Sequence, residues 1–445
     1  MFCIIQRERG RTRNTSEGGQ AVKRILLLSL LILLLPISIQ DSGVSADVDA
    51  RHASRAKEHV KLLALDEYKQ TLQSRGAQLS DQGVLIETSD GAQILAEHNA
   101  DVAFNPASVM KLATSLVAIL KLGPDYRYRT NVLADGNLDF DSRKLEGDLV
   151  IEASADPMFA IADSQEVATE LNRLGISRVT GALRIAGDFY YFATGYRSNL
   201  SKETSASKLR AALNRAGITI DGPTVYGEKS GTLLLSHYSD QLTQILLFQN
   251  AHSSNAVAEV VGESVGGPQA IQRFLTSRLA LTENELYVGH ASGLEFNRIT
   301  PRASLRVVRS LISVLAEHSL KLEDVMPVAG VDSGTLRTRL RGVDIEGAVV
   351  AKTGSLVSID NGVSTLVGVA YTVTRGPLLF VVFNSGGSVH QYRRLQDQFV
   401  ERFITEEGGP ARAMRAEDAL ADLPRQSIVQ VFYKRRVEAE PSAGE

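Results

Sequence analysis

Residues 104–124 read FNPASVMKLATSLVAILKLGP and contain the signals for the start, the body and the end of one helix. Asn105 suits the N-cap and Pro106 the first helical position, because a capping side chain accepts a backbone N–H and proline has none to lose. The apolar body is too short to cross a membrane and fits a buried core helix, which the final Gly-Pro pair ends. We therefore expect Ser108 in the first turn, where backbone N–H groups lack intrahelical acceptors.

Strand patterns lie on both sides of this helix. Residues 84–88 and 93–96 are apolar runs around a Ser-Asp-Gly turn, and residues 363–373 and 378–384 are β-rich runs around Thr-Arg-Gly-Pro. Each pair is typical of a hairpin. We expect both hairpins in one antiparallel sheet of about five strands. Helical patterns occur at 50–75, 241–248, 255–265, 304–317 and 391–405.

The pattern between residues 126 and 231 is different, with short strands and turns at 126–133, 147–153 and 178–185, and helical stretches at 163–173 and 204–216. We interpret 126–231 as an inserted domain of smaller size. The predicted main domain then comprises residues 47–125 and 232–407. For the polar C-terminal tail, residues 408–445, we predict no folded structure.

Composition limits the function classes. Of 445 residues, 44% are hydrophobic and 22% charged, which is typical of a globular protein and excludes disorder for most of the chain. A net charge of −3 gives no reason to expect nucleic acid as a partner. The single cysteine excludes intrachain disulfides, and the eight histidines include no H-x-x-x-H pair. We expect neither a metal nor another cofactor.

The N-terminus carries the pattern of an export signal. Residues 25–39 (ILLLSLLILLLPISI) follow a Lys-Arg pair and precede Val44-Ser45-Ala46, a cleavage-site pattern. We predict a signal peptide at residues 1–46, cleaved after export to the periplasm, so that the only membrane contact is through the uncleaved signal. A retained anchor is the alternative. Residues 1–21 are long and polar for such a signal, so translation beginning near Val22 is a second possibility.

Three short motifs occur in order: SVMK at 108–111, SSN at 253–255 and KTG at 352–354. The serine and lysine of the first motif would lie one turn apart on a helix face. A serine hydroxyl is a good nucleophile only when a base takes its proton, and lysine can be that base only when burial or a nearby cation lowers its pKa. Lys352 of the third motif would be such a cation. An oxyanion would fit at the N–H groups of the helix start.

Other copies of these short patterns weaken each motif taken alone. S-x-x-K also begins at Ser54 and at Ser205, and K-S-G begins at Lys229. Only the Ser108 copy has a proline at the helix start and an apolar helix behind it. Only the Lys352 copy follows an apolar β-run. The ordered set therefore favours an acyl-transfer site over coincidence.

The chain resembles the D-alanyl-D-alanine carboxypeptidase/endopeptidases of the low-molecular-mass class C penicillin-binding proteins, from about residue 84 to 403. Besides the triplets, which serine β-lactamases share, the resemblance rests on longer motifs. These are PAS with KL around Ser108, GDLV at 147–150 leading to Asp156-Pro157, ASGL at 291–294 with Asn297-Arg298, and MPVAGVDSGTL at 326–336. It implies an α+β penicillin-binding-protein/serine β-lactamase-like transpeptidase fold: the five-stranded sheet flanked by helices, an all-α subdomain and an inserted smaller α/β domain.

The resemblance implies catalytic roles for four residues. Ser108 would be the acylated nucleophile and Lys111 its base. Ser253 would relay the proton to the leaving amine, and Asn255 would position the substrate amide and Lys111. The implied reaction is serine-type D-Ala-D-Ala carboxypeptidase or endopeptidase cleavage of peptidoglycan stem peptides, with β-lactam antibiotics as inhibitors.

Substrate binding is implied for the stretch that starts at Lys352. Lys352 and Thr353 would hold the terminal carboxylate, and the strand that continues through Gly354 and Ser355 would pair with the extended peptide. The N–H groups of Ser355 and of the nucleophile would form the oxyanion hole. Asp156 would face the substrate's diamino acid side chain, although an acidic residue before proline is also a common turn former.

The sequence departs from the family at Ser254, where Asp is common, at Ser154-Ala155-Asp156, where glycines are favoured, and in the shortened insert. Two alternatives stay open. A serine β-lactamase would need a glutamate that activates water, and no E-x-x-L-N motif is present. A non-catalytic peptidoglycan-binding scaffold would have no reason to keep the triplets. The sequence does not decide between carboxypeptidase and endopeptidase activity, nor the oligomeric state.

Overall fold

The computed structural model describes residues 62–192, 200–342, 345–413 and 426–433. The predicted signal at 1–46, the alternative start near Val22 and the first part of the predicted helix at 50–75 lie outside these residues.

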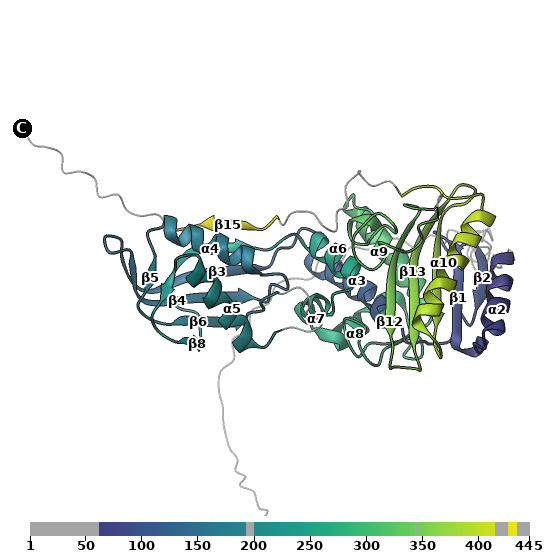
Figure 1. Cartoon of the computed structure of the whole chain (residues 1–445), viewed down its shortest axis with the longest axis horizontal. Coiled ribbons are helices and arrows are strands. Elements are labelled where there is room, and N and C mark those ends of the chain that lie inside the picture. Colours follow the sequence, from purple (N-terminus) through teal and green to yellow (C-terminus); the bar gives the residue numbers. More distant parts are fainter. Residues whose placement is uncertain (1–61, 193–199, 343–344, 414–425, 434–445) are drawn as a thin grey trace, which may run out of the picture. The chain divides into compact units, whose positions relative to one another are not determined.

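One antiparallel sheet of five strands forms the centre of the main domain, as the sequence predicts (Figure 1). Its order is β12-β13-β14-β1-β2, so the hairpin that precedes Ser108 lies beside the strands that follow Lys352. Its strands are β1 (Gln82–Thr88), β2 (Ile94–His98), β12 (Val349–Leu356), β13 (Val363–Thr372) and β14 (Gly376–Asn384).

Alternation along the strands sends side chains to two apolar cores. Val350 and Val367 join the core that contains the all-α subdomain, whereas Val349 and Leu366 join a second core on the opposite face. The first core includes α3 (Met110–Leu122), α6 (Leu242–His252), α7 (Asn255–Ser264), α8 (Gly267–Leu279) and α9 (Pro301–Glu317). The second includes α2 (Leu63–Ser74) and α10 (Val389–Glu406). Short 3-10 helices η1 (Leu79–Asp81) and η3 (Leu322–Asp324) and the small hairpin β10 (Leu286–Tyr287) and β11 (Arg298–Ile299) complete this domain.

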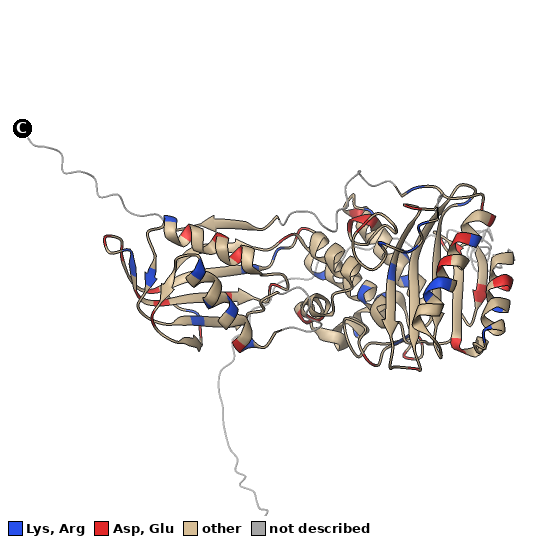
Figure 2. Ribbon diagram, in the orientation of Figure 1, with Lys and Arg blue, Asp and Glu red and all other residues tan. Residues whose placement is uncertain are grey.

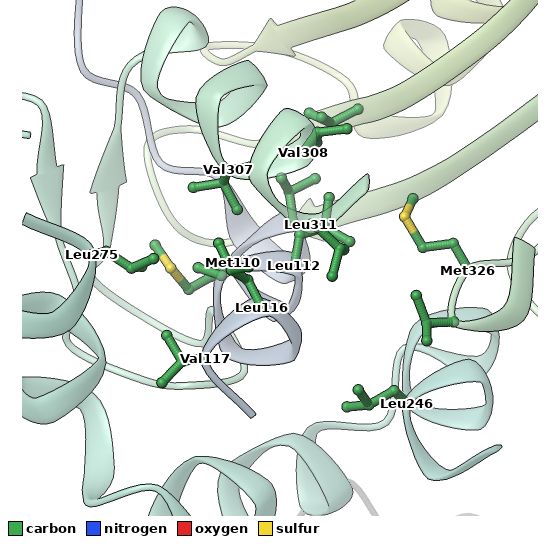
Figure 3. Packing of buried hydrophobic residues seen from close by; sticks show 14 of the residues in the cluster. Met110, Leu112, Leu116, Val117, Leu246, Leu275, Val307, Val308, Leu311 and Met326 are labelled. Atoms are coloured by element: carbon green, nitrogen blue, oxygen red, sulfur yellow. The ribbon is translucent and has the colours of Figure 1, made fainter. Parts of the chain in front are cut away.

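The helix α3 is buried on all sides in the first core, and Figure 3 shows its side chains among those of the surrounding helices. Its start differs from the expectation. Residues 107–109 form a separate 3-10 helix, η2 (Ala107–Val109), and α3 begins only at Met110. Asn105 does cap the turn, because its Oδ1 accepts from the Ala107 N–H at 2.9 Å. Ser108 therefore lies in a tight turn before the regular helix.

The insert has its own mixed sheet, with helices α4 (Ile161–Arg173) and α5 (Lys202–Arg215). Its strands are β3 (Arg129–Asp139), β4 (Lys144–Ser154), β5 (Arg178–Val179), β6 (Leu183–Asp188), β7 (Thr219–Ile220), β8 (Thr224–Tyr226) and β9 (Thr232–Tyr238). The sequence analysis placed the end of the insert at residue 231. Strand β9 pairs with β3 up to Tyr238 opposite Arg129, so the sheet of the insert extends past that boundary.

The C-terminal tail also contains a strand that the sequence analysis left out. Residues Ile428–Val431 form β15, which pairs antiparallel with β9 at the edge of the insert's sheet. Ile428 is half exposed, and four residues carry too little alternation to predict a strand. Pairing with β9, which is distant in the sequence, therefore determines that these residues form a strand.

Charges of both signs are interspersed along the same elements (Figure 2). Within the described ranges, no helix combines the length and the apolar character that crossing a membrane requires.

The packing of α3 gives a first prediction. Leu116 is fully buried in the core of Figure 3, whereas Leu63 on α2 is 57% exposed. We expect Leu116→Ala to lower the free energy of unfolding by about 3 kcal/mol, because it removes buried methyl groups and leaves a cavity. Leu63→Ala, the matched control, should change it by less than about 0.5 kcal/mol. Chemical denaturation measures both, and equal effects would contradict the packing described.

Candidate active site

Lys111 connects the first two motifs. It lies on α3 one turn after Ser108, and its Nζ donates to Ser108 Oγ at 2.9 Å. The same Nζ donates to Asn255 Oδ1 at 2.7 Å and to the Ser292 carbonyl at 2.6 Å. Three acceptors thus hold a fully buried ammonium group against the serine hydroxyl.

The second motif forms a sharp turn between α6 and α7. Ser253 ends α6 with a left-handed backbone (φ 54°), and Asn255 is the first residue of α7. Ser254, where the family commonly has Asp, caps α7 by accepting from the Val257 N–H at 3.3 Å. Serine is a good N-cap, so this departure keeps the turn. The turn places Ser253 and Asn255 next to different lysines.

The third motif brings the second lysine to Ser253. Lys352 Nζ donates to Ser253 Oγ at 3.0 Å and to the Thr353 carbonyl at 2.7 Å, and its side chain is fully buried. Lys352 lies two residues after Val350 on β12, so both side chains point to the face of the sheet that packs against the all-α subdomain. The structure therefore joins all three predicted motifs through one hydrogen-bonded turn.

Gly354 lets β12 approach the turn that carries Ser108. A Cβ at this position would lie 2.2 Å from Thr365 Oγ1 and 2.6 Å from the Pro106 carbonyl. Thr365 Oγ1 itself donates to that carbonyl at 2.8 Å. Only a glycine fits between the strand and the turn.

Burial changes the basicity of both lysines. Desolvation lowers the pKa of Lys111 to about 7, and the nearby carboxylate of Glu259 opposes this shift. Desolvation also lowers the pKa of Lys352 well below its ordinary value, with repulsion from Lys111 as the second cause. The sequence analysis named Lys352 as the cation that would activate Lys111. Burial is the principal cause of the lowered pKa values, and the mutual repulsion of the two ammonium groups acts in the same direction.

Several contacts of this site come from residues to which the sequence analysis gave no role. Glu259 accepts from the Ser292 N–H at 3.0 Å and lies one turn after Asn255 on α7. Thr335 Oγ1 accepts from Thr353 Oγ1 at 2.9 Å. The motifs ASGL and VDSGTL marked Ser292 and Thr335, but a motif alone does not show which atom it contributes.

The duplicate motifs lie elsewhere. Ser205 is a buried residue of α5 whose Oγ accepts from the Tyr191 N–H at 3.2 Å. Lys229 is exposed and pairs with Glu152 of the insert at 2.7 Å. Ser54 lies outside the described residues. Neither described copy joins the Ser108 network.

Asp156 is buried and follows β4, with only 2% of its surface exposed. Its Oδ1 accepts from the Met158 N–H at 2.8 Å, two residues on, which is the contact of a turn-forming aspartate. Its charge also raises the pKa of Tyr126, an effect second to that of burial. These contacts fit the turn-former interpretation, and a role in substrate binding stays a prediction.

One group of described residues has the composition of a metal site. Asp163, Glu166 and His237 each offer a ligand atom within 4.8 Å of one another. However, Asp163 Oδ1 and His237 Nε2 are already hydrogen bonded at 2.9 Å, and Asp163 Oδ2 caps α4 through the Ala160 N–H. These contacts account for the buried pair as part of the insert's packing.

A five-stranded sheet with a serine and a lysine at the head of the central helix defines the class of the penicillin-binding proteins and serine β-lactamases. Within this class, the chain belongs to the D-Ala-D-Ala carboxypeptidase 3 (S13) peptidase family, whose model matches residues 63–199 and 191–405.

Curated relatives match parts of the chain. The D-alanyl-D-alanine carboxypeptidase of an Actinomadura species is 28% identical over 225 residues, which are 45% of this chain and 40% of that protein. The D-alanyl-D-alanine carboxypeptidase DacB of Haemophilus influenzae is 26% identical over 104 residues, 23% of this chain and 21% of that protein. The matched stretches thus span less than half of either relative.

Solved structures share the fold over most of the chain. Bd3459, a predatory peptidoglycan endopeptidase from Bdellovibrio bacteriovorus, has a TM-score of 0.65 at 23% identity, covering 77% of this chain and 98% of its own. Penicillin binding protein 4 from Haemophilus influenzae has a TM-score of 0.63 at 20% identity, covering 76% of this chain and 98% of its own. One structure of Bd3459 is acylated by penicillin G.

The close approach at Gly354 gives a second prediction. We expect Gly354→Ala to lower the free energy of unfolding by about 1–3 kcal/mol, because the added methyl group must push β12 away from the Ser108 turn. Gly227→Ala is the control, since a Cβ there would meet only the Arg184 side chain at 3.7 Å. Chemical denaturation gives the stabilities, and a crystal structure of the variant gives the displacement. An unshifted strand would contradict the close fit.

Proposed function

We propose that this protein is a serine-type D-Ala-D-Ala carboxypeptidase/endopeptidase that cleaves peptidoglycan stem peptides through an acyl-enzyme on Ser108. The observation that carries the proposal is the pair of lysine contacts on the two ends of the 253–255 turn: Lys111 donates to Ser108 and Asn255, and Lys352 donates to Ser253. Membership of the S13 family supports the same reaction.

In the acylation step, Ser108 Oγ attacks the carbonyl carbon of the penultimate D-Ala. Neutral Lys111 accepts the hydroxyl proton at Nζ, which lies 2.9 Å from Ser108 Oγ. Burial makes this possible, because a lysine with a pKa of about 7 is half neutral near neutral pH. The peptide C–N bond then breaks, and Ser253 relays the proton taken up by Lys111 to the amine of the leaving D-Ala. Water later hydrolyses the ester and frees Ser108.

The oxyanion that forms in this step would meet two backbone N–H groups. Ser108 lies in the first turn before α3, where N–H groups lack intrahelical acceptors. The N–H of Ala351 points away from β13, since it donates to the Pro327 carbonyl. N–H directions alternate along a strand, so the N–H of Ser355, four residues later, points outward as well. Two converging donors of this kind stabilise the tetrahedral intermediate.

The substrate would pair with the outer edge of β12. Val328 bridges Val350 at this edge, but no strand among the described residues pairs with it beyond that point. An extended peptide can therefore add to residues 352–356. Its terminal carboxylate would lie near Lys352 and Thr353, with Gly354 and Ser355 as the strand it follows, and Asp156 would contact the diamino acid side chain.

Stem peptides ending in D-Ala-D-Ala are the proposed partners, and the proposed location is the periplasm, reached through the signal at residues 1–46. β-Lactams are the proposed inhibitors because their strained amide would acylate Ser108 in the same way. The penicillin-acylated form of Bd3459 supports this.

Labelling with a fluorescent penicillin tests the nucleophile. We expect the wild-type protein to bind the label covalently and Ser108→Ala to lose it entirely, because the hydroxyl forms the ester. Ser205→Ala, which alters the other described S-x-x-K serine, should label like the wild type. Equal labelling of Ser108→Ala and wild type would refute the assignment.

Release of D-Ala from a purified muropeptide, measured with the same three proteins, tests the reaction. Steady-state turnover of nitrocefin without D-Ala release would favour a serine β-lactamase. Stoichiometric binding to peptidoglycan without labelling or D-Ala release would favour a scaffold.

The pH dependence of acylation tests the base. Because only neutral Lys111 accepts the proton, we expect the second-order rate of penicillin labelling to rise with pH and level off above about 7. Below that pH, the rate should fall about tenfold per unit. Glu259→Gln removes a negative charge that raises the Lys111 pKa, so the profile should shift to lower pH. Glu263→Gln, one turn further along α7, is the control; equal profiles for Glu259→Gln and wild type would contradict the electrostatic role.

A further inference from the structure

Arg393 is a cation beside the site that none of the motifs includes. It lies in the second turn of α10, and its guanidinium donates to Ser355 Oγ at 2.9 Å. The acidic residue nearest in its helix, Asp397, pairs with Arg339 at 2.6 Å. Among the described residues, Arg393 therefore forms no ion pair, and its side chain is exposed.

The hydroxyl groups at this end of the site donate their protons within the protein. Ser355 Oγ donates to the Gly354 carbonyl at 2.6 Å. Thr353 Oγ1 donates to Thr335 Oγ1, which in turn donates to the Ala251 carbonyl at 3.2 Å. An arginine carries five N–H donors, and among the described residues Arg393 uses its Nη2 group on Ser355, so other N–H groups remain for a ligand on this side of β12.

The charges of the cations near the site also favour Arg393 as the group that binds an anionic ligand. Burial lowers the pKa of both Lys111 and Lys352, so each holds its proton less tightly than an exposed lysine does. Desolvation also lowers the pKa of Arg393, but a guanidinium starts so high that it stays charged in a protein. A substrate carboxylate requires a cation that persists while Lys111 is neutral and able to act as a base.

Geometry places Arg393 within reach of that carboxylate. In a peptide paired with β12, the scissile carbonyl oxygen faces the Ser355 N–H, and the terminal carboxylate follows at about one residue length, roughly 3.5 Å. Ser355 and Thr353 share the strand parity that points away from Ser108, towards the face covered by α10. The Arg393 guanidinium, in contact with Ser355 Oγ, lies on that side.

We propose that Arg393 is a specificity-determining residue that binds the C-terminal carboxylate of the substrate. The inference rests on the proposed function and adds to it the residue that selects substrates ending in a free carboxylate. A planar guanidinium can bind such a group through two parallel hydrogen bonds.

Two acyl donors that differ only in this charge test the proposal. The first is diacetyl-L-Lys-D-Ala-D-lactate, and the second is its D-lactamide. In both, Ser108 Oγ forms a new ester with the D-Ala carbonyl carbon, and the bond from that carbon to the lactyl oxygen breaks. The leaving D-lactate or D-lactamide takes up the serine proton on its hydroxyl oxygen. We expect Arg393→Gln to lower kcat/KM for the D-lactate by about 10- to 100-fold, the range of a charge-assisted hydrogen bond. The D-lactamide value should change less than about twofold.

The neighbouring Arg394→Gln is the matched control and should leave both values unchanged, since Arg394 is also exposed on α10. Arg393→Lys should restore part of the preference for the D-lactate, because it keeps the charge and loses the planar geometry. Equal losses for both donors in Arg393→Gln would show that Arg393 only positions Ser355, and would overturn the proposal. A wild-type protein inert towards both donors would overturn the proposed function and this inference with it.

Discussion

Two lysine ammonium groups, those of Lys111 and Lys352, lie in one buried region, and the surrounding structure must compensate for their lost hydration. An unpaired ammonium group in the interior costs several kcal/mol, so each needs acceptors and a lower tendency to hold its proton. Oxygens of Ser108, Asn255 and Ser292 surround the first, and oxygens of Ser253 and Thr353 the second. The same burial that costs stability lowers the pKa of Lys111 to about 7, which leaves it partly neutral near neutral pH, as the proposed acylation step requires. The residues that hold the buried lysines are therefore the ones to which the proposed reaction gives catalytic roles.

This requirement explains why glycines lie on both sides of the turn that carries Ser108. The strand β12 must approach the Ser108 turn closely enough to bury Lys352, and Gly354 permits this. From the other side, a Cβ at Gly293 would lie 1.9 Å from the Ala107 carbonyl, so the segment that supplies the Ser292 carbonyl also needs a glycine. Close backbone packing on both sides contributes to the full burial of the two lysines.

Much of this domain could be predicted from the sequence because its signals are local. The apolar body of α3, the hairpins of the central sheet and each of the three motifs depend on residues close together in the chain. The contribution of Glu259 and Arg393 could not be predicted, because α7 and α10 bring them to the site only through tertiary packing. The same holds for β9 and β15, whose pairing depends on a distant strand. The first residue of α3 was predicted too early. Asn105 caps a separate 3-10 turn at residues 107–109, and the capping signals in the sequence do not distinguish such a turn from the start of an α-helix.

The pairing of β15 with β9 has a consequence for biosynthesis. Strand β9 ends at Tyr238, but its neighbour at the sheet edge is not made until the ribosome has passed residue 431. While the second part of the main domain is being translated, the backbone groups on that side of β9 have no strand to pair with, and an unpaired edge can pair with strands of other chains. The chain therefore completes its inserted domain last. A nascent polypeptide that stops short of β15 would leave the ribosome with an unpaired, aggregation-prone sheet edge.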